Sequence, residues 1–124
     1  MQWIVLIGNE SLSLNSIKNL KHNGSIREYD VPEFGDRYCI EFDTDHIFYD
    51  YEEGENATID YSPLELEQIP FSTIHTLTMV YQSEARMKKI IKQENFLKDV
   101  YIDNGYGLIL PINKFIQLGM PMNK

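Results

Sequence analysis

The chain has 124 residues, 43% of them hydrophobic, and a formal net charge of −8 at pH 7. This length predicts one folded domain over residues 1–119, and the acidic balance disfavours binding to nucleic acids or anionic membranes. The single cysteine, Cys39, excludes an internal disulfide framework, and the start at Met1 lacks a signal-peptide pattern, so we expect a cytoplasmic protein.

Two elements are expected before the first long alternating pattern. Residues 4–7 form a short apolar run that predicts a buried strand. Residues 11–22 carry one apolar stripe at helical spacing and end before Gly24, which predicts an amphipathic helix. A second strand is expected over residues 25–29, and the proline that follows at position 32 ends it.

Residues 37–52 show the most regular alternation and predict a β-hairpin. A two-residue turn at Thr44–Asp45 joins the two halves and matches apolar residues with apolar residues on one face. On the other face the same register places Arg37 opposite Glu52, a favourable pair of opposite charges.

A three-residue loop at 54–56 is expected to continue this hairpin into a third strand. That strand would set Asp60 directly opposite Asp50, and like charges in such positions are destabilising. Either this register is wrong, or the outer face of the sheet carries a costly acidic cluster, formed by Glu41, Asp50, Glu52 and Asp60.

The second half of the chain predicts a helical turn, a central strand, a helix, a hairpin and a short helix, over residues 63–67, 74–81, 83–93, 100–110 and 112–119. Asn104–Gly105 is typical of a two-residue hairpin turn, and residues 120–124 are expected to fray. These elements predict an α+β fold with a mostly antiparallel sheet, formed by the central meander and the C-terminal hairpin. The two main helices, 11–22 and 83–93, are expected to pack on one face.

Two groups of polar residues have the composition of reactive or metal sites. The run 43–46, Asp-Thr-Asp-His, has the spacing of a cation loop, but no glycine or distal glutamate completes it, so a hairpin turn is favoured. The Asp50/Asp60 pair has three interpretations: an acid/base or metal site, a protein-binding site, or a solvated acidic face. The three histidines fall in separate elements, so no metal or cofactor is expected.

The distribution of charge is the feature that points most clearly to a partner. Residues 38–85 contain eleven carboxylates and no lysine or arginine. A surface of one sign attracts a partner of the opposite sign, so we expect a basic protein partner. The candidate partner-binding residues are Glu41, Asp43, Asp45, Asp50, Glu52, Glu53, Glu55 and Asp60.

Together with the ending at residues 100–111, the acidic stretch 43–60 gives the chain the charge and layout of a known class of proteins. The chain resembles the small acidic immunity proteins of bacterial polymorphic toxin systems. This resemblance implies a non-catalytic inhibitor that neutralises a basic toxin domain. Two alternatives stay open: a small metal-dependent or acid/base enzyme centred on Asp50 and Asp60, and a structural subunit of a larger assembly.

Overall fold

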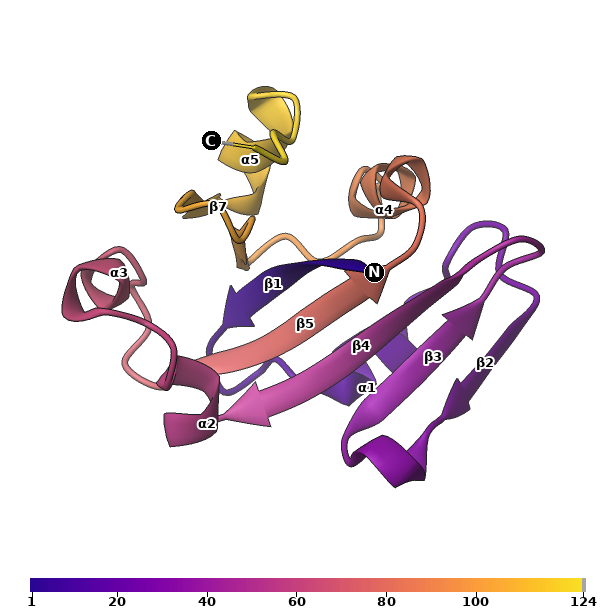
Figure 1. Cartoon of the computed structure of the whole chain (residues 1–124), viewed down its shortest axis with the longest axis horizontal. Helices are drawn as coiled ribbons and strands as arrows, with labels where there is room; N and C mark the ends of the chain where they lie inside the picture. The colour runs from indigo at the N-terminus through magenta and orange to yellow at the C-terminus, as the bar shows by residue number, and fades with distance from the viewer. Residues whose placement is uncertain (124) are drawn as a thin grey trace.

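An antiparallel sheet of seven strands forms the centre of the molecule (Figure 1). The computed structural model describes residues 1–123. The strands are β1 (Gln2–Gly8), β2 (Arg27–Asp30), β3 (Arg37–Glu41), β4 (His46–Glu53), β5 (His75–Tyr81), β6 (Tyr101–Asp103) and β7 (Ile109–Pro111). Their order across the sheet is β2-β3-β4-β5-β1-β6-β7, which confirms the predicted α+β class and the central place of the strand at 74–81.

Short helices lie around this sheet. They are α1 (Leu14–Lys18), the 3₁₀ helix η1 (Pro32–Phe34), α2 (Glu55–Thr58), α3 (Pro63–Glu67), α4 (Glu84–Ile91) and α5 (Ile112–Gln117). Ser83 caps α4 by accepting a hydrogen bond from the Arg86 backbone N–H at 3.1 Å. Helices α1 and α4 are both shorter than the predicted ranges 11–22 and 83–93.

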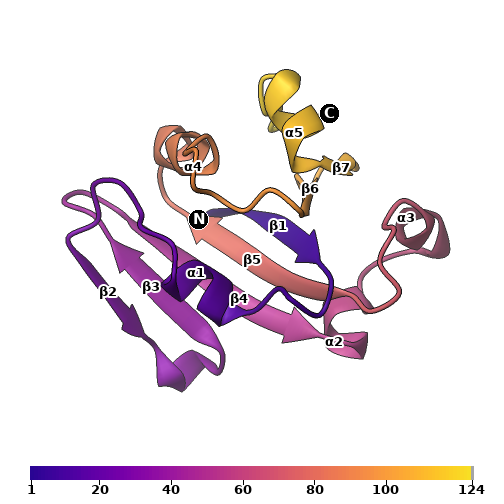
Figure 2. The same ribbon diagram turned by 180° about the vertical axis from the view of Figure 1, so that it is seen from behind.

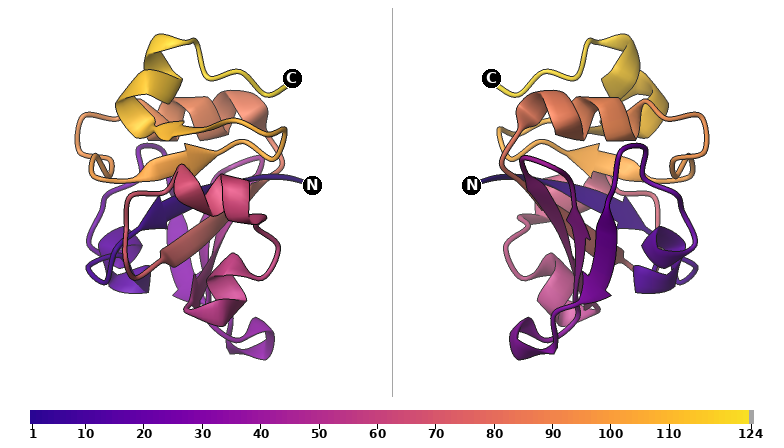
Figure 3. Two further views of the ribbon diagram at one scale, coloured as in Figure 1. Left: turned by 90° about the vertical axis from the view of Figure 1, so that its left-hand side faces the viewer. Right: turned by 90° about the vertical axis from the view of Figure 1, so that its right-hand side faces the viewer.

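The larger core lies between the sheet and three of the helices. Ile17 of α1, Met87 of α4 and Phe115 of α5 are fully buried in one cluster with the inward residues of the strands. Figure 2 shows α1 in front of the sheet, and Figure 3 shows α4 and α5 together at the end of the molecule where the C-terminus lies.

The opposite face of the sheet is covered only in part. A second cluster, built on Val5, Ile7, Ile69 and Ile109, packs the segment around α3 onto β1, β6 and β7. Within residues 1–123, no helix covers the same face of β2, β3 and β4, which is turned toward the viewer in Figure 1. We call this uncovered part the open face.

A buried hydrogen bond lies beneath β4, on the side away from the open face. His22 is 1% exposed, and its Nε2 lies 2.8 Å from the Tyr49 hydroxyl, while its Nδ1 lies 3.1 Å from the Leu20 carbonyl oxygen. The carbonyl can only accept, so Nδ1 donates and Nε2 accepts from Tyr49. Burial lowers the pKa of His22 to about 4, which keeps the ring neutral.

The predicted hairpin forms between β3 and β4, but its predicted register is wrong by two residues. Arg37 lies opposite Asp50 instead of Glu52, and the turn is Asp43–Thr44, with the Phe42 N–H donating to the Asp45 carbonyl at 2.8 Å. A shift of two residues leaves every side chain on its predicted face, so the apolar pattern alone does not separate the two registers. The Arg37 guanidinium then forms a fork with Asp50, at 2.6 and 2.8 Å.

The predicted third strand is also wrong. Gly54, with a φ of 61°, ends β4, and the chain continues into α2 instead of a strand. β4 pairs with β5 along seven residues, so Asp50 lies opposite Thr78 and not opposite Asp60. This pairing avoids the like-charge contact and places β4 beside β5, whose core-facing residues Leu77, Met79 and Tyr81 are fully buried.

The C-terminal hairpin is confirmed, but its tight turn is not. The loop spans residues 104–108, and the Asn104 side-chain oxygen accepts from the backbone N–H of Tyr106 and of Leu108. The Asn104 amide also donates to the Pro121 carbonyl at 2.8 Å, and Met120 is 2% exposed. The segment 120–124, expected to fray, therefore begins in the core; Lys124 lies outside the described residues.

Candidate functional site

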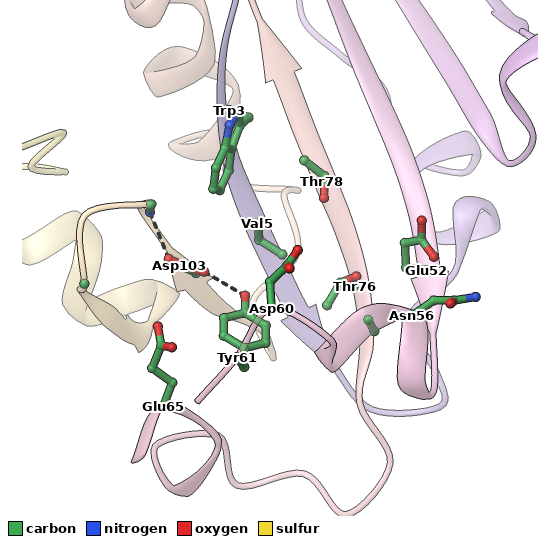
Figure 4. Close-up of a pocket in the computed structure, with 13 residues that line it drawn as sticks. Trp3, Val5, Glu52, Asn56, Asp60, Tyr61, Glu65, Thr76, Thr78 and Asp103 are labelled. Carbon is green, nitrogen blue, oxygen red and sulfur yellow. Dashed lines mark hydrogen bonds between the residues drawn. The ribbon is translucent and has the colours of Figure 1, made fainter. Parts of the chain in front are cut away.

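A cavity of about 430 Å³ opens at the edge of the open face, between β4 and α2 on one side and β6 and α3 on the other (Figure 4). Strands β1 and β5 form its floor. Four carboxylates line it, and within residues 1–123 its lining contains no lysine, arginine or histidine. These carboxylates are Glu52, Asp60, Glu65 and Asp103, and we call this site the acidic cavity.

Each carboxylate reaches the acidic cavity from a different element. Glu52 lies near the end of β4, opposite Thr76 of β5. Asp60 follows α2, Glu65 lies in the first turn of α3, and Asp103 ends β6. Their approach from four elements is possible because β4 stops at Gly54 and the chain crosses the end of the sheet before β5 begins.

Two of these carboxylates are held by hydrogen bonds within the protein. Asp103 accepts from the Tyr61 hydroxyl at 2.7 Å and from the Gly105 backbone N–H at 2.8 Å. Glu65 accepts from the Ser62 backbone N–H at 2.9 Å, which completes a capping box at the start of α3. Burial, together with the bond to Asp103, raises the pKa of Tyr61, so its hydroxyl remains a donor.

The other two carboxylates have no such partners. Glu52 and Asp60 are exposed, and neither forms an ion pair or a side-chain hydrogen bond with any residue from 1 to 123. Figure 4 shows both side chains at the cavity, Glu52 from β4 and Asp60 from the segment beside Tyr61. They are therefore free to meet a cation supplied from outside.

The remaining wall and floor add an aromatic ring and a hydroxyl. Trp3, the only tryptophan, is 47% exposed and packs on Gly105, where an added Cβ would lie 3.3 Å from the indole. Gly105 has a φ of 79°, so both its conformation and its contact with the ring require glycine. On the floor, Thr76 is 3% exposed, and its hydroxyl forms no hydrogen bond with residues 1–123.

Four of the eight predicted site residues are instead neutralised by arginines. Arg27 binds Glu41 at 2.7 Å and Arg37 binds Asp50 at 2.6 Å, both on the open face. Arg86 of α4 binds the hairpin turn, at 3.2 Å from Asp45 and 3.4 Å from Asp43. The arginine side chain lowers the pKa of Glu41. We call this set the arginine-paired carboxylates: Glu41, Asp43, Asp45 and Asp50.

The other four predicted residues divide between the cavity and its surroundings. Glu52 and Asp60 line the acidic cavity, and Glu55 begins α2. Glu53 accepts a hydrogen bond from the Tyr51 hydroxyl at 3.1 Å. The proposed Asp50/Asp60 pair on adjacent strands does not form, because Asp50 faces Thr78 and is held by an arginine.

Sequence reasoning missed four residues of this site. Glu65 is recognisable only as a helix cap, and Asp103 only as part of a hairpin. Trp3 alternates with the buried Ile4 at the start of β1, a signal that places it on the opposite face of the sheet. No local signal marks Thr76, because a threonine in a central strand is ordinary.

The four carboxylates of the acidic cavity do not come together as a metal-ligand set. Residues 1–123 bring no three histidine, cysteine, aspartate or glutamate side chains into an arrangement that could hold a metal ion. Among these residues, no helix is long and apolar enough to cross a membrane.

Comparison with known protein families, with curated proteins and with solved structures finds no match for this chain.

Proposed function

We propose that this protein is a non-catalytic binding module that recognises a basic protein through the acidic cavity. The observation that carries the proposal is the cavity lining, which has four carboxylates and, within residues 1–123, no positive side chain. Two of those carboxylates, Glu52 and Asp60, have no ion-pair partner among the same residues. A cationic partner would supply the missing countercharge.

Electrostatics favours such a partner both in the encounter and in the complex. A chain of net charge −8 attracts cationic proteins, and that attraction extends over a Debye length of about 8 Å at physiological salt. On contact, burial of an unpaired carboxylate is costly unless a cation and hydrogen bonds compensate it. The exposed Trp3 supplies the aromatic anchor that charge alone does not provide.

The resemblance to immunity proteins suggests which class of basic protein the partner belongs to. Under this resemblance the partner is a basic toxin domain, such as a nuclease, whose cationic surface is bound by electrostatic complementarity. In this form of the proposal the acidic cavity and its rim cover that surface. The cross-strand Asp50/Asp60 pair, on which the enzyme alternative was centred, does not form, because Asp50 lies opposite Thr78.

The test is co-purification from the native host with two matched baits. The first bait carries Glu52→Lys and Asp60→Lys, and the second carries the same charge change at the exposed residues Glu33 and Glu94, which do not line the cavity. Association of the isolated partner with each bait is then followed from about 0.05 to about 0.5 M salt.

The proposal expects a basic partner whose association is slowed at least about tenfold by the cavity reversal and much less by the matched control. Rising salt should slow association with the wild-type protein and reduce the difference between the baits. A neutral or acidic partner, or equal slowing by both baits, would overturn the proposal.

A further inference from the structure

We propose that the acidic cavity takes the guanidinium group of an arginine side chain presented by the partner. This inference rests on the proposed function and names the chemistry that the site recognises. Its ground is the combination of one flat aromatic wall, two unpaired carboxylates and one hydroxyl, that of Thr76, which opens onto the same cavity.

The aromatic wall suits a planar cation. Trp3 lies at one side of the cavity, and Glu52 and Asp60 lie across from it (Figure 4). A guanidinium stacks on an indole face by a cation–π interaction while its edge donates to carboxylates in a planar fork. The protein already uses this geometry within itself, since the Arg37 guanidinium lies 4.7 Å from the centre of the Phe48 ring and forks onto Asp50.

The floor supplies a polar group that a ligand can reach. Thr76 is 3% exposed as a residue, its hydroxyl opens onto the cavity, and it forms no hydrogen bond with another residue among 1–123. Glu52 of β4 lies directly opposite Thr76 of β5, so the hydroxyl and a free carboxylate lie at the same end of the cavity. A guanidinium has five N–H donors, enough to reach both acceptor types at once.

The same features disfavour the other two cations that a carboxylate site can attract. A bare metal ion needs several converging ligands, and residues 1–123 bring no three histidine, cysteine, aspartate or glutamate side chains together that could hold one. A lysine ammonium is a compact, strongly hydrated charge that presents neither a planar face for the indole nor a fork for the carboxylates.

Because Trp3 is the only tryptophan and lines the cavity, its fluorescence reports binding there. Emission of Trp3 is titrated with N-acetyl-arginine amide, N-acetyl-lysine amide and N-acetyl-citrulline amide at equal ionic strength. We expect a saturable change with the arginine probe, binding about fivefold weaker for lysine, and no saturation with the uncharged citrulline.

Two substitutions test the polar half of the site. Asp60→Asn should weaken binding of the arginine probe about tenfold, because a charge-assisted hydrogen bond is lost. Thr76→Val keeps the shape of the side chain and should weaken it about threefold. Glu94→Gln removes an exposed carboxylate that does not line the cavity and should leave binding unchanged.

The failures of the two proposals are distinguishable. Equal binding of the lysine and arginine probes, or no saturable binding of either, would overturn the guanidinium assignment even if cavity reversal still slows the basic partner. Saturable arginine binding that Asp60→Asn and Thr76→Val leave unchanged would place the probe elsewhere and also overturn it. Tight arginine binding combined with a partner indifferent to cavity reversal would overturn the proposed function instead.

Discussion

The two acidic regions of this molecule, the arginine-paired carboxylates and the acidic cavity, differ in what the fold brings to them. Arg27, Arg37 and Arg86 each reach a carboxylate of the first region at 3.2 Å or less. Within residues 1–123 no lysine or arginine lines the second. The difference teaches that carboxylates close together in sequence can have different surroundings, one group paired with arginines and the other left without a cation among residues 1–123.

The largest expected effect concerns His22, which is buried beneath β4 and hydrogen-bonded to Tyr49, and which must stay neutral in the folded protein. Burial lowers its folded-state pKa to about 4, whereas the unfolded value is 6.5, so the unfolded chain binds more protons between these values. Stability should therefore rise with pH across this window and fall by about 3 kcal/mol between pH 7 and pH 4.

Chemical unfolding at a series of pH values measures this slope. His22→Gln should remove the histidine contribution, while His46→Gln should keep it, because His46 is partly exposed. If the unfolding free energy of the His22→Gln variant depends on pH as steeply as that of the wild type, other groups cause the acid sensitivity and the assignment to His22 is wrong.

The next effect compares two carboxylates of one turn. The Asp45 side chain is 7% exposed and that of Asp43 is 77% exposed, although both bind Arg86. Asp45→Ala should cost about 2 kcal/mol, because it leaves a half-buried guanidinium without its main partner. Asp43→Ala should cost less than about 0.5 kcal/mol. Urea unfolding of the two variants checks this order, and equal costs would contradict it.

A smaller effect is expected from the fork on the open face. Arg37 and Asp50 are 22% and 30% exposed at the side chain, and their contact is bidentate. A double-mutant cycle with Arg37→Ala and Asp50→Ala should give a coupling energy of about 1 kcal/mol. A coupling near zero would mean that Asp50 is no more firmly held than Glu52 and Asp60.

The smallest effect has the opposite sign. Glu52→Gln and Asp60→Asn remove charges that lie among other carboxylates and have no cation among residues 1–123. Together they should leave stability unchanged or raise it by up to about 0.5 kcal/mol. A clear loss in thermal unfolding would show that these residues belong to the fold and not to a binding site.

The sequence predicts the elements of this fold better than their register. Alternation in 37–52 locates β3 and β4 and assigns their faces correctly, but a shift of two residues preserves both faces. In the observed register Arg37 forks onto Asp50, and β4 also pairs with β5, a contact between segments distant in sequence. Periodicity carries no information on such contacts.

The candidate site was predicted in part for the same reason. Counting charges along residues 38–85 finds Glu52 and Asp60, which line the cavity. The same count does not reveal that Arg27 and Arg86, which lie outside residues 38–85, pair with Glu41 and Asp45 in the folded chain. The like-charge conflict expected between Asp50 and Asp60 was the one local sign that the third strand was wrong.

The most direct test of this account compares neutralisation of the two regions on binding to the isolated basic partner. One variant carries Glu52→Gln and Asp60→Asn, and the other carries Glu41→Gln and Asp50→Asn, so both lose two negative charges. The account predicts that the cavity variant binds at least about a hundredfold more weakly, because two charge-assisted contacts are lost. The open-face variant should bind less than about threefold more weakly, through net charge alone. Equal losses, or a larger loss for the open-face variant, would contradict the claim that the acidic cavity is the binding site.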